Sequence, residues 1–279
     1  MASSPAIAVA RVLEMNEEIS LRHKASVGFA RQARELIISR LEDPEFTLSV
    51  SEKTSRTDVV TQIDKEVEEL LAHNISVKFP DDAIIGEEFG VSGGNGLFEW
   101  VIDPIDGTTN FIYGFPAYAI SIAVRRTTDL KVLSGVVLDV PRDRLYEATQ
   151  SGGSFANGKK LAVTNQDNIN DSLIGTGFSY SSAVRIRQGE IIASIITKIR
   201  DIRRAGAASL DLCMVAAGEL DAYYEQGLKP WDYMAGSLIV TEAGGMVDGG
   251  FTAHPTEDMI VASNSKVHSG LLELIQPFH

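Results

Sequence analysis

Two short stretches of this 279-residue sequence hold acidic side chains at close spacing. Glu87 and Glu88 stand together after a glycine, and Asp103 and Asp106 are three residues apart in the run Asp-Pro-Ile-Asp-Gly-Thr-Thr. Carboxylate oxygens are the ligands that Mg²⁺ prefers in proteins. Two such ions about 3.5–4 Å apart bind both the attacking and the leaving oxygen in phosphoryl chemistry. The acidic spacing therefore indicates a divalent-cation site suited to a phosphate ester.

The residues around the second acidic pair predict a tight turn after a buried strand. Val101 and Ile102 are β-branched, and Pro104 lacks the N–H that a strand ladder needs, so the strand is expected to end there. Gly107 permits unusual backbone angles. Thr108 and Thr109 then open a helical turn, whose first N–H groups point at anions. A plain surface turn is the alternative, because Asp, Pro and Gly are all turn formers.

A third acidic position lies far along the chain. The run Lys-Pro-Trp-Asp that ends at Asp232 opens a predicted helix, and that helix ends in Glu-Ala-Gly-Gly. Asp232 is expected to be the N-cap of the helix, since aspartate accepts hydrogen bonds from the first free N–H groups. Capping alone would explain Asp232. Beside the upstream carboxylates, it is also a candidate metal ligand.

Two helices followed by a sheet are predicted in the first part of the chain. Apolar residues at helical spacing predict helices from Ser4 to Leu41 and from Thr61 to Phe79, each stopped by a proline. Between residues 97 and 163, short β-rich runs separated by turn residues predict a mostly antiparallel sheet. These runs are Glu99–Ile102, Ala117–Arg125, Val132–Val140 and Leu145–Thr149.

After Ser172, helices and strands are predicted to alternate. The predicted helices are Ile186–Ile202, Ser209–Leu220, Asp232–Ala243 with Gly244 as its stop, and a last helix before Pro277. The predicted strands are Ala222–Glu225 and Met259–Ala262. The sequence thus predicts one unit of residues 1–279 with two sheet-and-helix halves, 1–165 and 166–279.

Composition restricts the class of protein. With 44% hydrophobic and 23% charged residues, the chain has the profile of a soluble globular protein. No basic region precedes the apolar run at residues 6–10, so no signal peptide is expected, and the single cysteine fits a cytoplasmic location. A net charge of −13 argues against direct nucleic-acid binding. An anionic substrate would need a bound cation.

Together these segments resemble the signature segments of the inositol monophosphatase family. The resemblance rests on Ile85–Glu88, on Trp100–Thr109, and on Trp231-Asp232 with the Glu-Ala-Gly-Gly helix end. Further matching positions, spread over nearly the whole chain, are Lys53, Asp58, Val60, Thr61, Asp64, Gly206–Ala208 and Ala222–Glu225. The resemblance implies an α+β fold, a layered αβαβα sandwich of the inositol monophosphatase and fructose-1,6-bisphosphatase type. It also implies a homodimer.

The resemblance further implies Mg²⁺ as the cofactor, with two or three ions per site, Mn²⁺ as a substitute and frequent inhibition by Li⁺. One ion would be held by Glu87, Asp103 and the Ile105 carbonyl. A second would be held by Asp103, Asp106 and Asp232, and Glu87 would share a weaker third ion.

The same resemblance implies which residues meet water and substrate. Thr108, with Glu87, Glu88 and Asp58, would orient the attacking water. The N–H groups of Gly107 and Thr108 would hold the phosphate. The residues implied in substrate binding are Asp106, Gly107, Thr108, Thr109, Gly206, Ala207, Ala208, Glu225 and Asp232, with Ala208 and Glu225 against the alcohol part.

Other motifs carry less weight. Residues 153–160 nearly form a P-loop, but the last position is Lys160 rather than Ser or Thr, and the flanking alternation predicts a hairpin. Gly175-Thr-Gly177 is predicted to be a strand-end turn. No histidine has a zinc spacing. Arg203 and Arg204 are predicted to lie at a solvated helix end, with contact to substrate or to a partner subunit as the alternative.

The sequence therefore predicts hydrolysis of a small phosphate monoester by a metal-activated water. Inositol monophosphate is the first candidate, histidinol phosphate is its rival, and fructose 1,6-bisphosphate and nucleotide 3′-phosphates follow. Residues 180–188 and 205–209 are expected to face the substrate but do not separate these candidates. A regulatory protein on the same fold, protein-binding or RNA-associated, is the alternative from another class.

Overall fold

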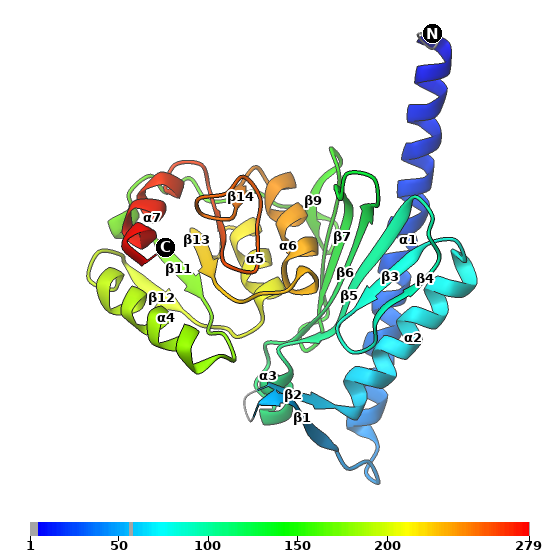
Figure 1. The fold of residues 1–279 in the computed structure, drawn as a ribbon, viewed down its shortest axis with the longest axis horizontal. Coiled ribbons are helices and arrows are strands. Elements are labelled where there is room, and N and C mark those ends of the chain that lie inside the picture. The colour runs from blue at the N-terminus through cyan, green and yellow to red at the C-terminus, as the bar shows by residue number, and fades with distance from the viewer. Residues whose placement is uncertain (1–4, 56–57, 279) are drawn as a thin grey trace.

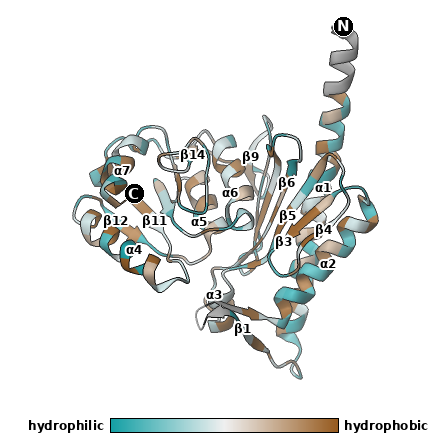
Figure 2. Ribbon diagram, viewed as in Figure 1, coloured by the Kyte–Doolittle hydropathy of each residue, from teal (hydrophilic) through white to brown (hydrophobic). Residues whose placement is uncertain are grey.

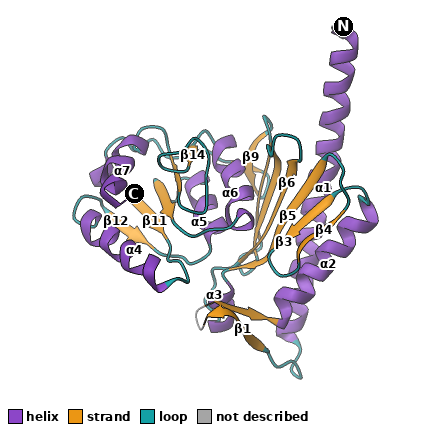
Figure 3. Ribbon diagram, in the orientation of Figure 1, coloured by secondary structure: helices purple, strands orange, loops and turns teal. Residues whose placement is uncertain are grey.

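The structure, a computed structural model, describes the backbone of residues 5–55 and 58–278 and the side chains of residues 13–53 and 60–278. Its helices, drawn in purple in Figure 3, are α1 (Pro5–Glu42), α2 (Gln62–Lys78), α3 (Thr108–Tyr113), α4 (Ser182–Ile195), α5 (Ala208–Ala216), α6 (Pro230–Glu242) and α7 (His268–Ile275). None of the helices in the described ranges is long and apolar enough to span a membrane.

The larger sheet has eight strands in the order β10-β9-β8-β7-β6-β5-β3-β4. All neighbours in it are antiparallel except β3 and β5, which run parallel. Its strands are β3 (Ala83–Gly86), β4 (Gly90–Gly93), β5 (Phe98–Asp106), β6 (Ala119–Arg126), β7 (Val132–Asp139), β8 (Arg144–Thr149), β9 (Gly153–Ala156) and β10 (Lys159–Lys160). The mostly antiparallel sheet is confirmed, and the near-P-loop segment is the predicted hairpin of β9 and β10.

The smaller sheet has five strands in the order β12-β11-β13-β15-β14. Its strands are β11 (Leu173–Thr176), β12 (Asp201–Arg203), β13 (Ala222–Glu225), β14 (Met246–Asp248) and β15 (Ile260–Ser263). Strand β11 runs parallel to both of its neighbours, whereas β15 is antiparallel to β13 and β14. A separate antiparallel hairpin, β1 (Val50–Ser55) and β2 (Asp58–Thr61), leads into α2.

Figure 1 shows the two sheets side by side, with α5 and α6 between them. Helices α1 and α2 cover the outer face of the larger sheet, and α4 and α7 cover the outer face of the smaller one. The layers therefore alternate as α, β, α, β, α. This confirms the layered α+β sandwich that the family resemblance implied.

Alternating side chains along the strands fill the layers between them. On β5, Trp100 and Ile102 pack toward α1 and α2, while Val101 faces α5 and α6. On β13, Tyr223 packs toward α5 and α6, while Tyr224 belongs to the core under α4 and α7. Figure 2 shows the resulting brown, hydrophobic strands of the larger sheet, whereas α2 carries both teal and brown residues. Both sheets are thus buried on two faces.

The prediction that the strand ends at Pro104 is wrong, because β5 runs on to Asp106. Asp103 pairs with Ser121 and Asp106 pairs with Ala119, so one extra residue lies between the pairs on β5. Such a bulge leaves residues out of the ladder, and a proline there needs no N–H partner. The bulge also redirects the chain at the point where both aspartates stand.

The predicted helix Ile186–Ile202 is correct only in its first part. Helix α4 ends at Ile195, and residues 201–203 form β12, which pairs with β11. The Arg200 N–H also donates to the Ser172 carbonyl at 3.0 Å. Pairing with a distant strand therefore overrides the local helical pattern here, as tertiary context often does.

A buried ion pair fixes α1 to the larger sheet. Arg22 donates to both carboxylate oxygens of Asp82, at 2.8 and 2.9 Å, and Trp100 Nε1 donates to the same carboxylate at 2.8 Å. The guanidinium lies 3.8 Å from the centroid of the Phe98 ring. An ion pair, hydrogen bonds and a ring contact thus fix the Arg22 side chain of α1 against the larger sheet.

Replacing Asp82 by alanine should lower the free energy of unfolding by about 3 kcal/mol, because the buried Arg22 would keep only the exposed Glu18 as an ion-pair partner and Trp100 Nε1 would lose its acceptor. Urea unfolding followed by circular dichroism measures this. The matched control is Asp81→Ala, an exposed neighbour, which should change the same quantity by less than about 0.5 kcal/mol. Equal effects of the two substitutions would show that the ion pair adds no stability.

Candidate active site

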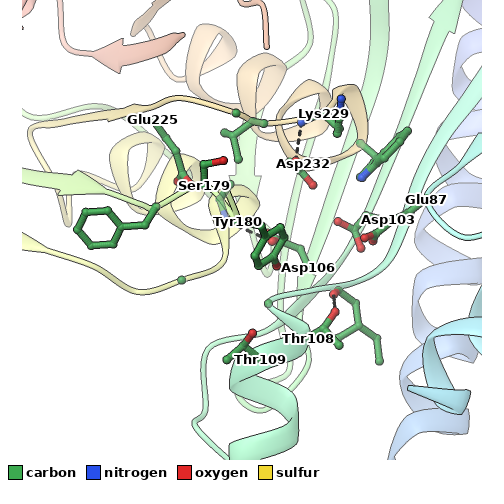
Figure 4. Close-up of a pocket in the computed structure, with 18 of the residues that line it drawn as sticks. Glu87, Asp103, Asp106, Thr108, Thr109, Ser179, Tyr180, Glu225, Lys229 and Asp232 are labelled. Carbon is green, nitrogen blue, oxygen red and sulfur yellow. Dashed lines mark hydrogen bonds between the residues drawn. The ribbon is translucent and has the colours of Figure 1, made fainter. Parts of the chain in front are cut away.

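A cavity of about 590 Å³ opens where α3, the start of α6 and the loops beside the smaller sheet meet. Figure 4 shows the carboxylates of Glu87, Asp103 and Asp232 pointing into the same space. The residues that line the cavity include Lys53, Glu87, Asp103, Ile105, Asp106, Gly107, Thr108, Thr109, Phe178, Ser179, Tyr180, Arg185, Arg204, Gly206, Ala208, Glu225, Lys229 and Asp232. They come from segments that are up to 179 residues apart, which only the fold brings together.

Asp103 lies at the centre of the acidic cluster and is 1% exposed. Burial raises its pKa well above the usual value, and the neighbouring charges of Glu87, Asp106 and Asp232 raise it further. Its Oδ1 atom is buried and has no hydrogen-bond partner among the described residues. A buried carboxylate oxygen without a donor costs free energy that a cation would recover.

Asp106 is oriented by the beginning of α5. The Ser209 N–H donates to Asp106 Oδ2 at 2.7 Å, and the Ala208 N–H donates to Oδ1 at 3.3 Å. The Ser209 hydroxyl donates to Oδ2 as well. These two N–H groups are the free donors of a helix start, where a carboxylate is stabilised. These hydrogen bonds fix Asp106, at the end of β5, to the start of α5 in the central helix layer.

Asp232 is the third residue of α6, not its N-cap. Helix α6 begins at Pro230, whose fixed φ suits the first helical position, and Lys229 is the capping residue. The Lys229 N–H donates to Asp232 Oδ2 at 2.6 Å, so the side chain folds back over the helix start. Its other oxygen faces the cavity. Burial raises the pKa of Asp232 well above the usual value, with Asp106 and Glu87 adding to the effect.

Thr108 is held at the start of α3 by a second carboxylate that lies outside the cavity. Its Oγ1 is 3.1 Å from both Asp64 Oδ1 and the Ile105 carbonyl oxygen. Asp64 is fully buried, and its other oxygen accepts the Thr61 N–H at 2.9 Å as part of the capping box of α2. Burial raises the pKa of Asp64. Thr108 thus presents a hydroxyl to the cavity with a proton acceptor behind it.

Gly107 makes this turn possible. Its φ of +94° lies in the left-handed region, and a Cβ at this position would come within 2.9 Å of the Ala117 carbonyl oxygen. Any side chain would therefore displace the turn. The first N–H groups of α3 follow directly, and they have no partner one turn earlier in the helix. Gly107, Thr108 and Thr109 line the cavity at this helix start.

Lys53 is the cation that meets the acidic cluster in the structure. Its Nζ lies 2.7 Å from Glu87 Oε1 and forms a second, short contact with Glu88 Oε1. Burial raises the pKa of Glu87 to about 7, against the opposing effect of Lys53. One ammonium therefore contacts two carboxylates, whereas Asp103, Asp106 and Asp232 form no ion pair with any of the described residues.

The donor set suits a hard divalent cation. Within the described residues, no group of three or more His, Cys, Asp or Glu side chains is placed so that it could hold a metal ion as the side chains stand. Lys53, Ser209 and Lys229 occupy oxygens of Glu87, Asp106 and Asp232. The free Oδ1 of Asp103 and the mutual repulsion of the carboxylates nevertheless fit Mg²⁺, which takes oxygen ligands and keeps several waters.

Most residues that the sequence analysis selected line this one cavity. They are Glu87, Asp103, Ile105, Asp106, Gly107, Thr108, Thr109, Gly206, Ala208, Glu225 and Asp232. Glu88 and Ala207 lie beside the cavity rather than in its lining, and the side chain of Asp58 lies outside the described residues. The carboxylate that contacts Thr108 is Asp64.

Sequence reasoning did not assign a role to Lys53 or Asp64, and it included Arg185 only within the segment 180–188 that was expected to face the substrate. Asp64 carried a signal, since a Thr-x-x-Asp run before an apolar helix is a capping box. The signal points to a cap, however, and not to a contact with Thr108 44 residues later. Nothing in the local pattern of Lys53 indicates that it faces the cavity.

Comparison with known proteins gives one consistent result. Residues 19–278 match the Inositol monophosphatase family. The chain belongs to this family. It is 40% identical over 247 residues to the inositol-1-monophosphatase of Mycobacterium bovis, covering 85% of this chain and 83% of that protein. It is also 40% identical over 262 residues to the Nus factor SuhB of Pseudomonas aeruginosa, covering 89% and 93% of the two chains.

Solved structures agree with this family assignment. The extragenic suppressor protein SuhB of Bartonella henselae superposes with a TM-score of 0.83 at 29% identity, covering 91% of this chain and 97% of that one. The expectation of a phosphoric monoester hydrolase is thus confirmed at the level of the inositol monophosphatase family.

In this member of the inositol monophosphatase family, Glu225 lies buried at the side of the cavity opposite Glu87 and Asp103 (Figure 4). Its Oε2 accepts a short hydrogen bond from the Tyr223 hydroxyl. Gly177 leaves room for it, since a Cβ there would come within 1.9 Å of the same oxygen. Burial raises the pKa of Glu225 to about 7, against the opposing effects of Tyr223 and Arg204.

The raised pKa predicts a pH-dependent cost to stability in metal-free protein. Because the folded pKa exceeds the unfolded value of about 4.3, Glu225 favours folding at low pH and loses this contribution as the pH rises toward 7. Glu225→Gln should therefore gain stability relative to the wild type between pH 5 and 8, by about 2 kcal/mol. Urea unfolding in EDTA at several pH values measures the difference. A difference that does not change with pH would contradict the assignment.

Proposed function

We propose that this chain hydrolyses a small-molecule phosphate monoester to an alcohol and inorganic phosphate, with inositol monophosphate as the first candidate substrate. The observation that carries the proposal is the set of four carboxylates, Glu87, Asp103, Asp106 and Asp232, around one cavity beside the free N–H groups of α3. The carboxylates and the start of α3, which can bind an anion, line the same cavity. This combination suits a phosphate only together with cations.

One Mg²⁺ would be held by Glu87, Asp103 and the Ile105 carbonyl. A second Mg²⁺ would be held by Asp103, Asp106 and Asp232. Glu87 would also bind a third, weaker ion. When bound, the ions would lower the pKa of a coordinated water and neutralise the charge that develops on the leaving oxygen. Holding them is the main task of the buried carboxylates. Mn²⁺ is the expected substitute, and inhibition by Li⁺ is part of the same proposal.

The chain's own residues would then align the reactants. The N–H groups of Gly107 and Thr108 would donate to the phosphate oxygens, which gain charge in the transition state. The Thr108 hydroxyl would accept a hydrogen bond from the attacking water and pass its own proton toward Asp64, 3.1 Å away. In-line attack forms the new P–O bond as the ester P–O bond breaks.

The alcohol part of the substrate would lie toward the smaller sheet. Thr109, Gly206 and Ala208 line the cavity there, and Glu225 would accept a substrate hydroxyl. One hydrogen bond to a substrate hydroxyl can decide between related alcohols. Histidinol phosphate therefore stays the main alternative, with fructose 1,6-bisphosphate and nucleotide 3′-phosphates behind it.

A regulatory role is a second proposal, and it rests on one observation. A relative that is as similar to this chain as the mycobacterial inositol-1-monophosphatase is named Nus factor SuhB. The net charge of −13 favours a protein partner over direct contact with nucleic acid. Sedimentation of the purified protein would test the homodimer that the family resemblance implies.

Phosphate release by the purified protein, with and without Mg²⁺, tests the main proposal. The panel is inositol 1-phosphate, histidinol phosphate, fructose 1,6-bisphosphate and a 3′-phosphoadenosine nucleotide. Mg²⁺-dependent turnover of inositol 1-phosphate is the expected result. Turnover of none of them, with Mg²⁺ binding intact, would contradict the proposal and place the regulatory role first. Capture of partner proteins from a lysate would then follow.

A further inference from the structure

A buried carboxylate of α2, Glu68, contacts the turn that carries Glu87. Glu68 is only 2% exposed, and Figure 1 shows α2 beside β3 and β4, the two strands that this turn joins. The Glu88 N–H donates to Glu68 Oε2 at 2.8 Å, and the Phe89 N–H donates to Oε1 at 2.9 Å. Hydrogen bonds to an ionised carboxylate are the stronger kind. Glu68 thus holds the main chain of the two residues that follow Glu87.

Gly86 leaves room for this carboxylate. A Cβ on Gly86 would come within 2.0 Å of Glu68 Oε1 and within 3.0 Å of Oε2. The φ of Gly86 does not lie in the left-handed region, so the backbone angle does not require a glycine here. The close approach of the Glu68 carboxylate does require one, because the carboxylate could move away only by giving up both N–H groups.

The same turn is held on its other side by Lys53. Its Nζ contacts the Glu87 and Glu88 side chains, whereas Glu68 contacts the main chain of residues 88 and 89. A cation therefore fixes the side chains of the turn, and an anion fixes its backbone. The two contacts are independent, so the Glu68 contact would remain when a metal ion replaces Lys53 at Glu87.

Helix α2 carries this contact as part of a rigid element. Asp64, which contacts Thr108, precedes Glu68 by four residues and therefore lies on the same face of the helix. The start of α2 is fixed by its capping box, and Val67 is fully buried in the core between α1, α2 and the larger sheet. One face of α2 thus reaches both the proposed water-orienting hydroxyl and the turn of the proposed metal ligand.

We propose that Glu68 is a positioning residue for Glu87, fixing the turn 87–89 so that the Glu87 carboxylate is in place to bind a divalent cation. This inference rests on the proposed function, because that function makes Glu87 a metal ligand. Mg²⁺ demands near-ideal octahedral geometry, so a displaced ligand binds it less well. Residues that orient metal ligands typically change metal affinity by about 10–100-fold when they are replaced. Glu68 itself does not line the cavity, so it would act through the turn.

Glu68→Gln tests the inference, because glutamine keeps the size of the side chain but has only one acceptor oxygen for the two N–H groups. Calorimetric titration of the metal-free, full-length protein with Mg²⁺ should give a dissociation constant about tenfold higher than that of the wild type, or more. The Mg²⁺ concentration for half-maximal phosphate release should rise in parallel. At saturating Mg²⁺, the KM for inositol 1-phosphate should change less than about threefold, since the turn is not proposed to contact the substrate.

Two control variants on α2 separate positioning from charge and from stability. Glu69→Gln removes the same charge at the exposed next residue. Val67→Ala leaves a cavity in the core and should lower Tm in EDTA without touching the turn. Both should leave the Mg²⁺ dissociation constant within about twofold of the wild type.

Gly86→Ala is a second variant that attacks the same contact while keeping the charge of Glu68. The added methyl group should displace the carboxylate from the turn and raise the Mg²⁺ dissociation constant about tenfold. Combining it with Glu68→Gln should raise the constant little further, because both substitutions remove the same two hydrogen bonds. If Glu68→Gln does not fold, as judged by circular dichroism, the same titration of Gly86→Ala decides on the proposal.

A Mg²⁺ dissociation constant of Glu68→Gln within twofold of the wild type, or an equal rise in Val67→Ala, would overturn the positioning role. That result would leave the phosphatase function intact, provided that the wild type releases phosphate with Mg²⁺. Conversely, a wild type that hydrolyses none of the phosphate esters but binds Mg²⁺ more tightly than Glu68→Gln would contradict the proposed function and support the positioning of Glu87. A wild type that binds no Mg²⁺ would overturn both.

Discussion

Asp103→Asn should lower kcat/KM for Mg²⁺-dependent phosphate release by about 10³-fold or more, which is about 4 kcal/mol of transition-state stabilisation. Asp103 is the carboxylate that both proposed main ions share. Its Oδ1 is also the buried oxygen without a donor among the described residues. Asparagine has the same shape but no charge, so the fold should remain while cation binding is lost.

The same variant has a second readout that does not depend on activity. In EDTA at pH 8, Asp103→Asn should be more stable than the wild type, because burial and three neighbouring carboxylates raise the pKa of Asp103. A raised folded pKa means that stability is lost as the pH rises above the unfolded value. The advantage of the variant should therefore shrink as the pH falls. Urea unfolding across pH measures both effects.

Mg²⁺ itself should distinguish the wild type from the variant. Ions that bind only the folded state raise Tm, so Mg²⁺ should raise the Tm of the wild type and leave that of Asp103→Asn nearly unchanged. The control is Asp258→Asn at an exposed position outside the cavity, which should behave as the wild type. Turnover within tenfold of the wild type, or an undiminished effect of Mg²⁺ on Tm, would contradict the role of Asp103.

Thr108→Ala should lower kcat by about 10²–10³-fold with little change in KM, because the hydroxyl is proposed to act on the attacking water rather than on the bound substrate. Asp64→Asn should have a similar effect through the 3.1 Å contact between the two side chains. Since the two residues act as a unit, the double variant should lose little more than the worse single one.

A conservative substitution of Thr108 tests whether the hydroxyl itself is needed for turnover, rather than the shape of the side chain. Thr108→Ser keeps the hydroxyl and should restore kcat to within about tenfold of the wild type. Thr128→Ala, at an exposed turn outside the cavity, is the control and should leave kcat unchanged. Additive losses in the double variant, or equal losses in Thr108→Ser and Thr108→Ala, would show that the hydroxyl does not work with Asp64.

The predictions for Asp103 follow from one feature of the protein, the burial of like charges around a cavity. Asp103, Asp106, Asp232 and Glu87 all have raised pKa values, with burial as the largest cause. Such a cluster destabilises the metal-free fold. The cost is offset where a cation binds, which is why cation binding and stability should change together in variants of these residues.

Local sequence patterns were enough to predict the long helices, the strand-rich middle of the chain and an acidic site. The bounds of α1 and α2 differ by one residue from prediction at the ends that the structure describes, because periodicity and prolines act locally. The central strands β6, β7 and β8 were predicted from the same kind of local pattern. Family membership also followed from short motifs, since each motif is contiguous in the chain.

The candidate active site itself depends on contacts between segments that are far apart in the sequence. The bulge at Pro104 depends on pairing with β6, the strand at residues 201–203 depends on β11, and the contact of Thr108 with Asp64 crosses 44 residues. The approach of Lys53 to Glu87 is likewise set by packing. Local propensity acts over a few residues, whereas charge, desolvation and ligand geometry arise only between groups that the fold brings together.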